Sequence, residues 1–351
     1  MDGFGRRVLL TALLAVAWEA MALPAATSGV AVRPHRAAHA VTLQTVTVTG
    51  VQPGPGLWKV IRGDHVMWIL GTLDELPGRI RWQAQEVRQR IAQSQQVLAA
   101  PVVRVHTEVG YFYKLAFNPA AQKLQDVVPP DDYAKWLRLK ALYRGSYGGI
   151  SYGDIESHRP IFAAIWLYLV AMEQADLSDA VIEPVIADAL KRHHLSLTPV
   201  VYRADPAGPP DAVRNLDLSQ ADDLRCFEQT LDHIEGDVEL IRSRANAWAL
   251  GDLNRLEQLP MSDQLDVCRT VLAESSAMRK LGVAGLHANV QAVWVAAASQ
   301  ALDTDKVSFA LLPMEYLLGP DNYLVALQAQ GDQVQLPDGL TAPAAAESGA
   351  R

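Results

Sequence analysis

The segments with strand-like composition stand mainly near the two ends of this chain, whereas most of its middle shows helical periodicity. Two short apolar runs at 57–61 and 66–70, separated by the turn residues 62–64, predict a β-hairpin. Near the other end, 307–312 and 333–336 have the composition of strands. A sheet in such a chain is assembled from segments that are distant in sequence. We therefore predict an α/β or α+β fold, with a central sheet of N- and C-terminal strands flanked by many helices.

Between the ends, the spacing of apolar residues predicts a series of helices and two more strands. The strands are expected at 96–100 and 197–202. The helices are expected at 80–93, 130–143, 161–172, 178–193, 219–250, 263–280, 286–302 and 321–330. The segment 219–250 is expected to form either one long helix or two in succession. No internal repeat is present, so we predict one continuous domain over residues 56–340.

The first 22 residues have the organisation of an export signal. Arg6 and Arg7 precede the apolar run 8–18, and Ala20 and Ala22 provide the small residues that signal peptidase requires. The run is shorter than the roughly 20 residues needed to cross a bilayer. We therefore expect cleavage near Leu23, no transmembrane anchor and a periplasmic or secreted protein, with a retained anchor as the alternative.

The segments beside the predicted domain are rich in small residues. Residues 23–55 are expected to form a flexible lead-in with at most one weak strand at 41–51, and 341–351 a disordered tail. The chain has 31 Lys and Arg residues against 39 Asp and Glu, a net charge of −8. Because phosphate binding needs a basic surface, this balance argues against a nucleic-acid partner.

The chain has two cysteines, Cys226 and Cys268, both in segments with helical periodicity. In an oxidising compartment an even pair is a candidate disulfide, and two unrelated buried thiols are the alternative. Neither cysteine has a second ligand at C-x-x-C or C-x-x-H spacing, which disfavours a metal site.

One familiar catalytic pattern has a formal match. Residues 149–153 read G-x-S-x-G around Ser151, but the preceding residues lack the apolar strand that a nucleophile elbow needs. A glycine-rich connector is therefore favoured over a serine hydrolase that would draw on Asp232, His233 or His287. No histidine is paired at i, i+4 with another, so a surface or capping role is expected for each of His65, His193, His194, His233 and His287.

Five short motifs follow one another in a recognisable order over residues 56–337. They are L-W-K-V at 57–60, G-T-L-D at 71–74 before Pro77, R-P-I-F-A-A at 159–164, A-W-A-L-G-D at 247–252, and the closing run 309–331. Together they resemble the TraB/GumN family, which includes PrgY and is related to the Tiki-type metalloproteases. The GumN branch, exported proteins with a cysteine pair flanking the A-W-x-x-G-D segment, is the most similar. The resemblance implies the scaffold of a metal-dependent peptidase.

The polar site positions that the resemblance implies are altered in this chain. The first histidine of the family, in G-T-x-H, falls on Asp74, and the acidic residue that ends the next strand falls on or near Ala100. The second histidine, in G-x-G-H, falls on Tyr316. The remaining family positions comprise the matching Gly71, Thr72, Gly319 and Trp294, and the altered Val290, Gln291 and Pro313, which stand in place of Arg, Asn and Gly.

These substitutions lead to two hypotheses about function. A hydrolytic metal site needs imidazoles and a carboxylate around one ion, but alanine offers no ligand and a protonated tyrosine is a poor one. We therefore favour a catalytically impaired relative, a pseudoenzyme without a cofactor, that binds a peptide or glycan in a vestigial cleft. The alternative is an active metallohydrolase in which Asp74, Glu75 and Glu315 hold Mn²⁺, Mg²⁺ or Ca²⁺.

Overall fold

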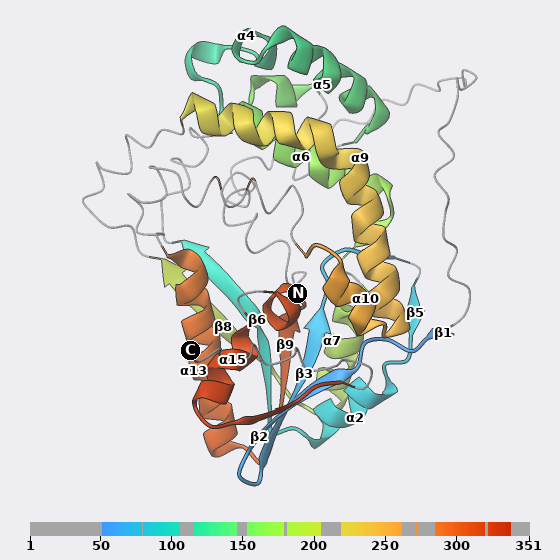
Figure 1. Cartoon of the computed structure of the whole chain (residues 1–351), viewed down its shortest axis with the longest axis vertical. Helices are drawn as coiled ribbons and strands as arrows, with labels where there is room; N and C mark the ends of the chain where they lie inside the picture. The colour runs from blue at the N-terminus through green and yellow to red at the C-terminus, as the bar shows by residue number, and fades with distance from the viewer. Residues whose placement is uncertain are drawn as a thin grey trace, which may run out of the picture.

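A six-stranded mixed sheet with the strand order β10-β2-β3-β9-β6-β8 lies in the lower part of the molecule as drawn in Figure 1. The computed structural model describes residues 51–78, 80–105, 116–145, 153–178, 181–204, 219–261, 268, 271, 285–319 and 322–337. The six strands are β2 (Leu57–Arg62), β3 (His65–Thr72), β6 (Gln96–Val105), β8 (Leu197–Ala204), β9 (Val307–Pro313) and β10 (Gln333–Gln335). The predicted α/β class and the sheet built from both ends of the chain are confirmed.

The C-terminal strand β9 is inserted between two strands from the first third of the chain. β2 and β3 form the predicted antiparallel hairpin, with Arg62 opposite His65 beside the turn. β9 pairs in parallel with β3 on one side and with β6 on the other, and β6 pairs in parallel with β8. Because β3, β9 and β6 run in the same direction, their carboxyl ends meet at one edge of the sheet.

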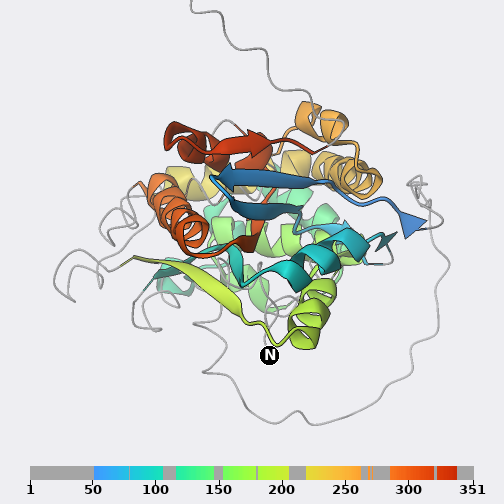
Figure 2. The ribbon, with the colours of Figure 1, turned by 90° about the horizontal axis from the view of Figure 1, so that it is seen from below.

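Helices cover both faces of the sheet. Seen from below in Figure 2, α13 (Leu286–Thr304) lies on one face, and α2 (Gln85–Gln93) with α7 (Glu183–Arg192) lies on the other. Val87 and Ile91, one turn apart on α2, are buried. The short helices α10 (Leu253–Gln258), α14 (Glu315–Leu318) and α15 (Tyr323–Ala329) complete this half.

Two predicted helices begin later than expected, because short strands take their first residues. Arg81–Trp82 forms β5, which pairs with β1 (Val51–Gln52), so α2 begins at Gln85 and not at residue 80. Leu177–Ser178 forms β7, which pairs with β4 (Leu76–Pro77), and α7 begins at Glu183 with a proline in its first turn. Most of the predicted helix 263–280, the signal segment 1–22 and residues 23–50 and 341–351 lie outside the described residues.

A second hydrophobic cluster is built mainly from helices. It comprises α4 (Leu124–Val127), α5 (Pro130–Leu142), α6 (Pro160–Gln174) and the first half of α9 (Gln220–Leu250), with the 3-10 turns Pro119–Ala121 and Asp154–Ser157 beside them. Every α6 residue from Pro160 to Met172 is buried, as expected of a helix that is apolar on all sides. No helix in the described ranges is long and apolar enough to span a bilayer.

The long helix α9 joins the two clusters. Its buried residues between 226 and 241 belong to the helical cluster, and those between 245 and 249 belong to the core around the sheet. The side chain of Ser219 caps its start by accepting from the Asp222 N–H, and Gly251, at φ 69°, ends it in the left-handed conformation. At 1.5 Å per residue these 31 residues span about 46 Å. The helical segment predicted over 219–250 is therefore confirmed, and it forms one long helix and not two in succession.

A disulfide and a buried ion pair stabilise the helical cluster. Cys226 and Cys268 are bonded, with their Cα atoms 5.2 Å apart, so the predicted disulfide is confirmed and two unrelated thiols are excluded. Arg159 at the start of α6 donates from Nε and Nη2 to Asp223 of α9, at 2.7 and 2.6 Å. The arginine of the R-P-I-F-A-A motif therefore connects two helices.

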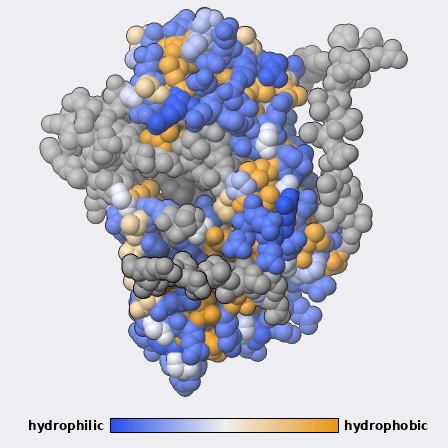
Figure 3. Space-filling model, viewed as in Figure 1, coloured by the Kyte–Doolittle hydropathy of each residue, from blue (hydrophilic) through white to orange (hydrophobic). Residues whose placement is uncertain are grey.

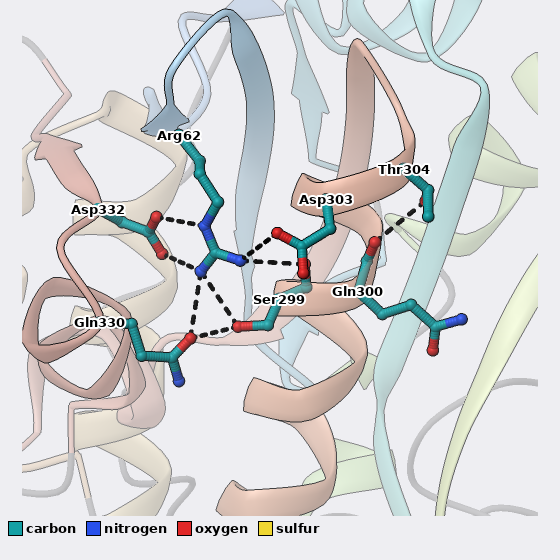
Figure 4. A network of polar contacts seen from close by, with 7 residues as sticks. All are labelled: Arg62, Ser299, Gln300, Asp303, Thr304, Gln330 and Asp332. Carbon is teal, nitrogen blue, oxygen red and sulfur yellow. Dashed lines mark hydrogen bonds and ion pairs between the residues drawn. The ribbon is translucent and has the colours of Figure 1, made fainter.

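A single arginine ties the hairpin to the C-terminal segments at the lower end of the sheet (Figure 4). Arg62 donates from Nε and Nη2 to the two carboxylate oxygens of Asp332, each at 2.7 Å, and from Nη1 to Asp303 of α13 at 2.8 Å. It also contacts Ser299 and Gln330. The hydrogen bond to Asp332, whose side chain is only 1% exposed, raises the pKa of Arg62 above its ordinary value.

We expect the buried ring of His158, beside the helical cluster, to make the free energy of unfolding depend on pH. Its ring is buried against Phe117, and its Nδ1 lies 3.2 Å from the Asp154 carbonyl oxygen. Burial lowers the pKa of His158 below its ordinary value of 6.5. Because the unfolded chain then binds the proton more readily, the free energy of unfolding should fall as the pH drops below about 6.5, until the folded pKa is passed.

Urea unfolding between pH 7.5 and pH 5 measures this dependence. We expect His158→Gln to flatten it, whereas the exposed His193→Gln should leave it unchanged. Equal slopes in the wild type and in His158→Gln would contradict the prediction.

Candidate functional site at the carboxyl edge of the sheet

The turns that follow β3 and β9 lie side by side at the carboxyl edge of the sheet. The last paired residues are Thr72 and Pro313, and the Met314 N–H then donates to the Thr72 carbonyl oxygen at 2.9 Å. Asp74 and Glu315 follow these positions by two residues each. The structure thus brings the two predicted site turns together, at the edge where open α/β sheets usually bind ligands.

A tryptophan from α9 supports the first of these turns. The Trp248 indole N–H donates to the Gly71 carbonyl oxygen at 2.8 Å, and both groups are buried. A Cβ on Gly71 would lie 2.5 Å from the end of the Met314 side chain, so glycine lets the two turns approach closely. The A-W-A-L-G-D motif is therefore linked physically to the G-T-L-D motif.

Gly319 follows the last residue of α14, and it has less room for a side chain than Gly71 has. Its N–H donates to the Glu315 carbonyl oxygen at 3.0 Å, and an added Cβ would lie 2.3 Å from that same oxygen. Since the obstacle is backbone, we expect Gly319→Ala to lower the free energy of unfolding by about 1–3 kcal/mol.

Gly236→Ala is the matched control for this substitution. Gly236 lies within α9, and a Cβ there would meet nothing within 4 Å. The control should be stabilised by up to about 1 kcal/mol, because alanine is the better helix former. Chemical denaturation of both variants measures the difference, and a shift of the same sign in both would contradict the close contact at Gly319.

The family position for an acidic ligand lies at a β-bulge. Leu98 pairs with Thr198 and Pro101 pairs with Val200, so Ala99 and Ala100 lie opposite the single residue Pro199. Bulges are frequent beside active sites, where they redirect a side chain. Here the half-buried Ala100 carries a methyl group in place of a ligand.

Tyr316, at the position where the resemblance implies a second histidine, carries a stacked aromatic ring. Tyr316 lies parallel to Tyr323 of α15, with ring centroids 4.4 Å apart and an interplanar angle of 8°. His287, on the first turn of α13, stands edge-on to both rings at 5.4 and 6.3 Å. Trp294 packs on Tyr323 at 5.8 Å, so the tryptophan retained from the family motif belongs to the same group of rings.

The donors at the family positions do not suit a hydrolytic metal ion. Asp74 offers one carboxylate, Ala100 offers none, and the Tyr316 ring is stacked on a neighbour. In the part of the chain that the structure describes, no three His, Cys, Asp or Glu side chains are grouped as the ligands of one ion would be.

The remaining predicted site residues have varied positions. Asp74, Glu75 and Glu315 are half-buried, Val290 is buried, and Gln291 is half-buried one turn before Trp294 on α13. His193, His194 and His233 are exposed, and the half-buried His65 lies beside the hairpin turn. Ser151 lies outside the described residues.

Sequence reasoning missed the neighbours of Tyr316. The sequence places Tyr323 only in the closing helix and predicts a surface or capping role for His287. His287 is indeed exposed, but it also contacts the rings of Tyr316 and Tyr323. The spacing of seven residues between His287 and Trp294, which places both on one side of a helix, was the available signal.

The fold and this edge define an α/β protein in which the turns after β3 and β9 meet at the carboxyl edge of a mixed sheet. Comparison with sequence models of protein families matches residues 56–336 to the TraB/PrgY/gumN family. The match covers more than half of the chain and spans both hydrophobic clusters, so the chain belongs to the TraB/PrgY/GumN family. No curated protein and no solved structure gives a significant match.

Proposed function

We propose that this family member is an exported, catalytically impaired relative of metal-dependent peptidases that acts as a binding or accessory protein. A peptide or glycan would bind at the carboxyl edge of the sheet. The observation that carries the proposal is the position of Tyr316, which replaces an imidazole and stacks on Tyr323 at 4.4 Å. A phenol held in this way is a poor metal ligand but a good contact surface.

The export part of the proposal has separate support. Residues 1–22 have the organisation of a cleavable signal. The Cys226–Cys268 disulfide is typical of proteins that fold in an oxidising compartment. Expression of the full chain in a bacterial host and mass analysis of the periplasmic product should find an N-terminus near Leu23. A product that keeps residues 1–22 would contradict export by cleavage.

A second candidate function is an active metallohydrolase that uses Asp74, Glu75 and Glu315. The contact between Met314 and Thr72 favours it, because this backbone bond brings the turns that carry these three carboxylates together. Hard cations such as Mn²⁺, Mg²⁺ and Ca²⁺ prefer oxygen ligands of this kind.

A peptidase assay separates the two candidates. Peptide substrates are incubated with the exported protein and added Mn²⁺ or Co²⁺, and cleavage is followed by mass spectrometry. Our proposal predicts no cleavage above that of a matched preparation of Asp74→Ala. Turnover that disappears in Asp74→Ala, but persists in the control Glu239→Ala on the exposed face of α9, would overturn it.

A further inference from the structure

We propose that the outward side of α5 is a dimer interface, on which α5 of a second copy of this chain packs antiparallel around a two-fold axis near Leu137. The surface belongs to the helical cluster and not to the carboxyl edge of the sheet, so it does not depend on the proposed function. It is carried by exposed apolar side chains on α5 and by opposite charges at the two ends of this helix.

α5 is apolar on its outward side as well as on its buried side. Trp136 and Leu139 are buried in the helical cluster. On the outward side Leu137 is 47% exposed and Leu142 is 55% exposed, and Ala141 is exposed too. The outward side of a surface helix normally carries charged and polar residues. α5 lies at the upper end of the molecule in Figure 1, where Figure 3 shows hydrophobic residues among hydrophilic ones.

The first turn of α5 and the adjoining part of α9 form an acidic end. Burial raises the pKa of Asp132, and the carboxylate of Glu228 on α9 raises it further. Lys135 lowers this pKa, but its ammonium group is already paired with Asp232. Asp131 is exposed, and neither Asp131 nor Glu228 forms an ion pair with a described residue. This end of the helix therefore carries negative charge without a cation to balance it.

The last turn of α5 and the residues after it form a basic end. Burial raises the pKa of Tyr143, and Glu235 of α9 raises it further. Arg242 and Arg138 lower it, so their charges act on the same hydroxyl. Arg144 follows directly, and neither Arg138 nor Arg144, both exposed, forms an ion pair with a described residue. The helix dipole favours charges of these signs at the two ends, but it does not account for the exposed leucines.

A two-fold axis through the middle of α5 brings these opposite ends together. In an antiparallel pair centred near Leu137, Asp131 lies opposite Arg144 of the second copy, because each residue stands roughly 10 Å from the centre at 1.5 Å per residue. Ala134 lies opposite Ala141, and such small side chains let two helices approach closely. The two copies of Leu137 pack on each other at the axis. Because the interface is isologous, each charge pair occurs twice.

A second copy fits this surface better than other partners do. An anionic lipid surface would attract Arg138 and Arg144 but would be repelled by Asp131 and Glu228 on the neighbouring turns. A partner with charges of one sign would likewise match only one end. A second copy matches both ends and covers the exposed leucines.

Sedimentation velocity of the purified full chain, over a range of protein and salt concentrations, tests the inference. We expect a monomer–dimer equilibrium with a dissociation constant of about 1–100 μM, as for other small interfaces. Added salt should weaken the dimer, because the charges at the two ends of α5 are exposed. A protein that remains monomeric at about 1 mM would overturn the inference.

A leucine variant and its control locate the apolar contact. Leu137→Ser should weaken the dimer by at least about tenfold, because the lost side chain lies at the centre of the interface in both copies. Val325→Ser changes a side chain on α15 that is 59% exposed, and it should leave the dimer unchanged. Equal dissociation constants in the two variants would place the interface elsewhere and overturn the inference.

A charge exchange tests the antiparallel arrangement. Asp131→Lys and Arg144→Glu should each weaken the dimer by at least about tenfold, because each places like charges opposite one another. An equimolar mixture of the two variants should dimerise within about threefold of the wild type, since both facing pairs are again of opposite sign. Glu257→Lys, on the exposed face of α10, is the control and should have no effect. A mixture that associates no better than either variant alone would overturn the inference.

Vesicles of phosphatidylglycerol test the other occupant of this surface. We expect the protein not to sediment with them. Sedimentation of the monomeric protein with the vesicles, lost in Leu137→Ser and retained in Val325→Ser, would assign the outward side of α5 to a lipid surface and overturn the inference.

Discussion

Replacing Arg62 by methionine is expected to lower the free energy of unfolding by about 3–4 kcal/mol. The arginine makes a bidentate pair with Asp332, whose side chain is 1% exposed, and a further ion pair with Asp303. Removing it leaves the buried carboxylate of Asp332 without its cation, a loss that typically costs about 3–5 kcal/mol. The lower part of this range applies because the Arg62 side chain is 26% exposed and water can partly replace it. Urea unfolding at pH 7 measures the change.

Two control variants test whether the buried pair is the cause. Asp303→Asn removes the partner whose side chain is 63% exposed and should cost less than about 1 kcal/mol. The double variant Arg62→Met with Asp332→Leu removes both charges and should recover more than half of the loss. If Arg62→Met lowered the free energy of unfolding as little as Asp303→Asn does, Arg62 would not hold the hairpin to the C-terminal segments.

Replacing both cysteines by alanine is expected to lower the free energy of unfolding by about 4 kcal/mol. The bond between Cys226 and Cys268 closes a loop with a sequence separation of 42, and the chain-entropy relation gives about this value for such a loop. Both cysteines are buried, and the Thr230 hydroxyl donates to the Cys226 carbonyl oxygen at 2.8 Å beside them. Alanine is the suitable replacement because a serine hydroxyl at these buried positions would add a polar group.

Thiol labelling provides an independent check of the bond. The purified protein, unfolded in denaturant without reductant, should show no reactive thiols, and after reduction it should show two. The free energy of unfolding of the reduced wild type should agree with that of the double alanine variant to within about 1 kcal/mol. Two free thiols before reduction would contradict the bond, and an unchanged stability after reduction would contradict its role.

The sheet could be predicted from the sequence because each of its strands carries a local signal. The runs at 57–61 and 66–70 are separated by a turn, and the structure pairs them as β2 and β3. The order of the strands carries no such signal, because the insertion of β9 between β3 and β6 depends on contacts across more than 200 residues. The predicted first residues of two helices are wrong, because residues with a helical pattern form the two-residue strands β5 and β7 instead.

The site could be predicted only in part. The family motifs located Asp74, Ala100 and Tyr316 in the sequence, and the structure shows that β3 and β9 bring the turns of Asp74 and Tyr316 together. The bulge at Ala100 and the ring stack of Tyr316 on Tyr323 depend on tertiary packing, which no single motif encodes. The contact between Trp248 and Gly71 joins two motifs that lie 177 residues apart, and neither motif alone predicts it.

The metal content of the purified protein tests most directly the proposal that this family member has lost its metal site. The protein is purified without chelators, and its bound metals are quantified by elemental analysis before and after dialysis against Mn²⁺. With Asp74, Ala100 and Tyr316 at the family positions, we predict no stoichiometric metal in either sample, and the same result for Asp74→Ala. One metal ion per chain in the wild type, absent from Asp74→Ala and retained in the control Glu239→Ala, would contradict it.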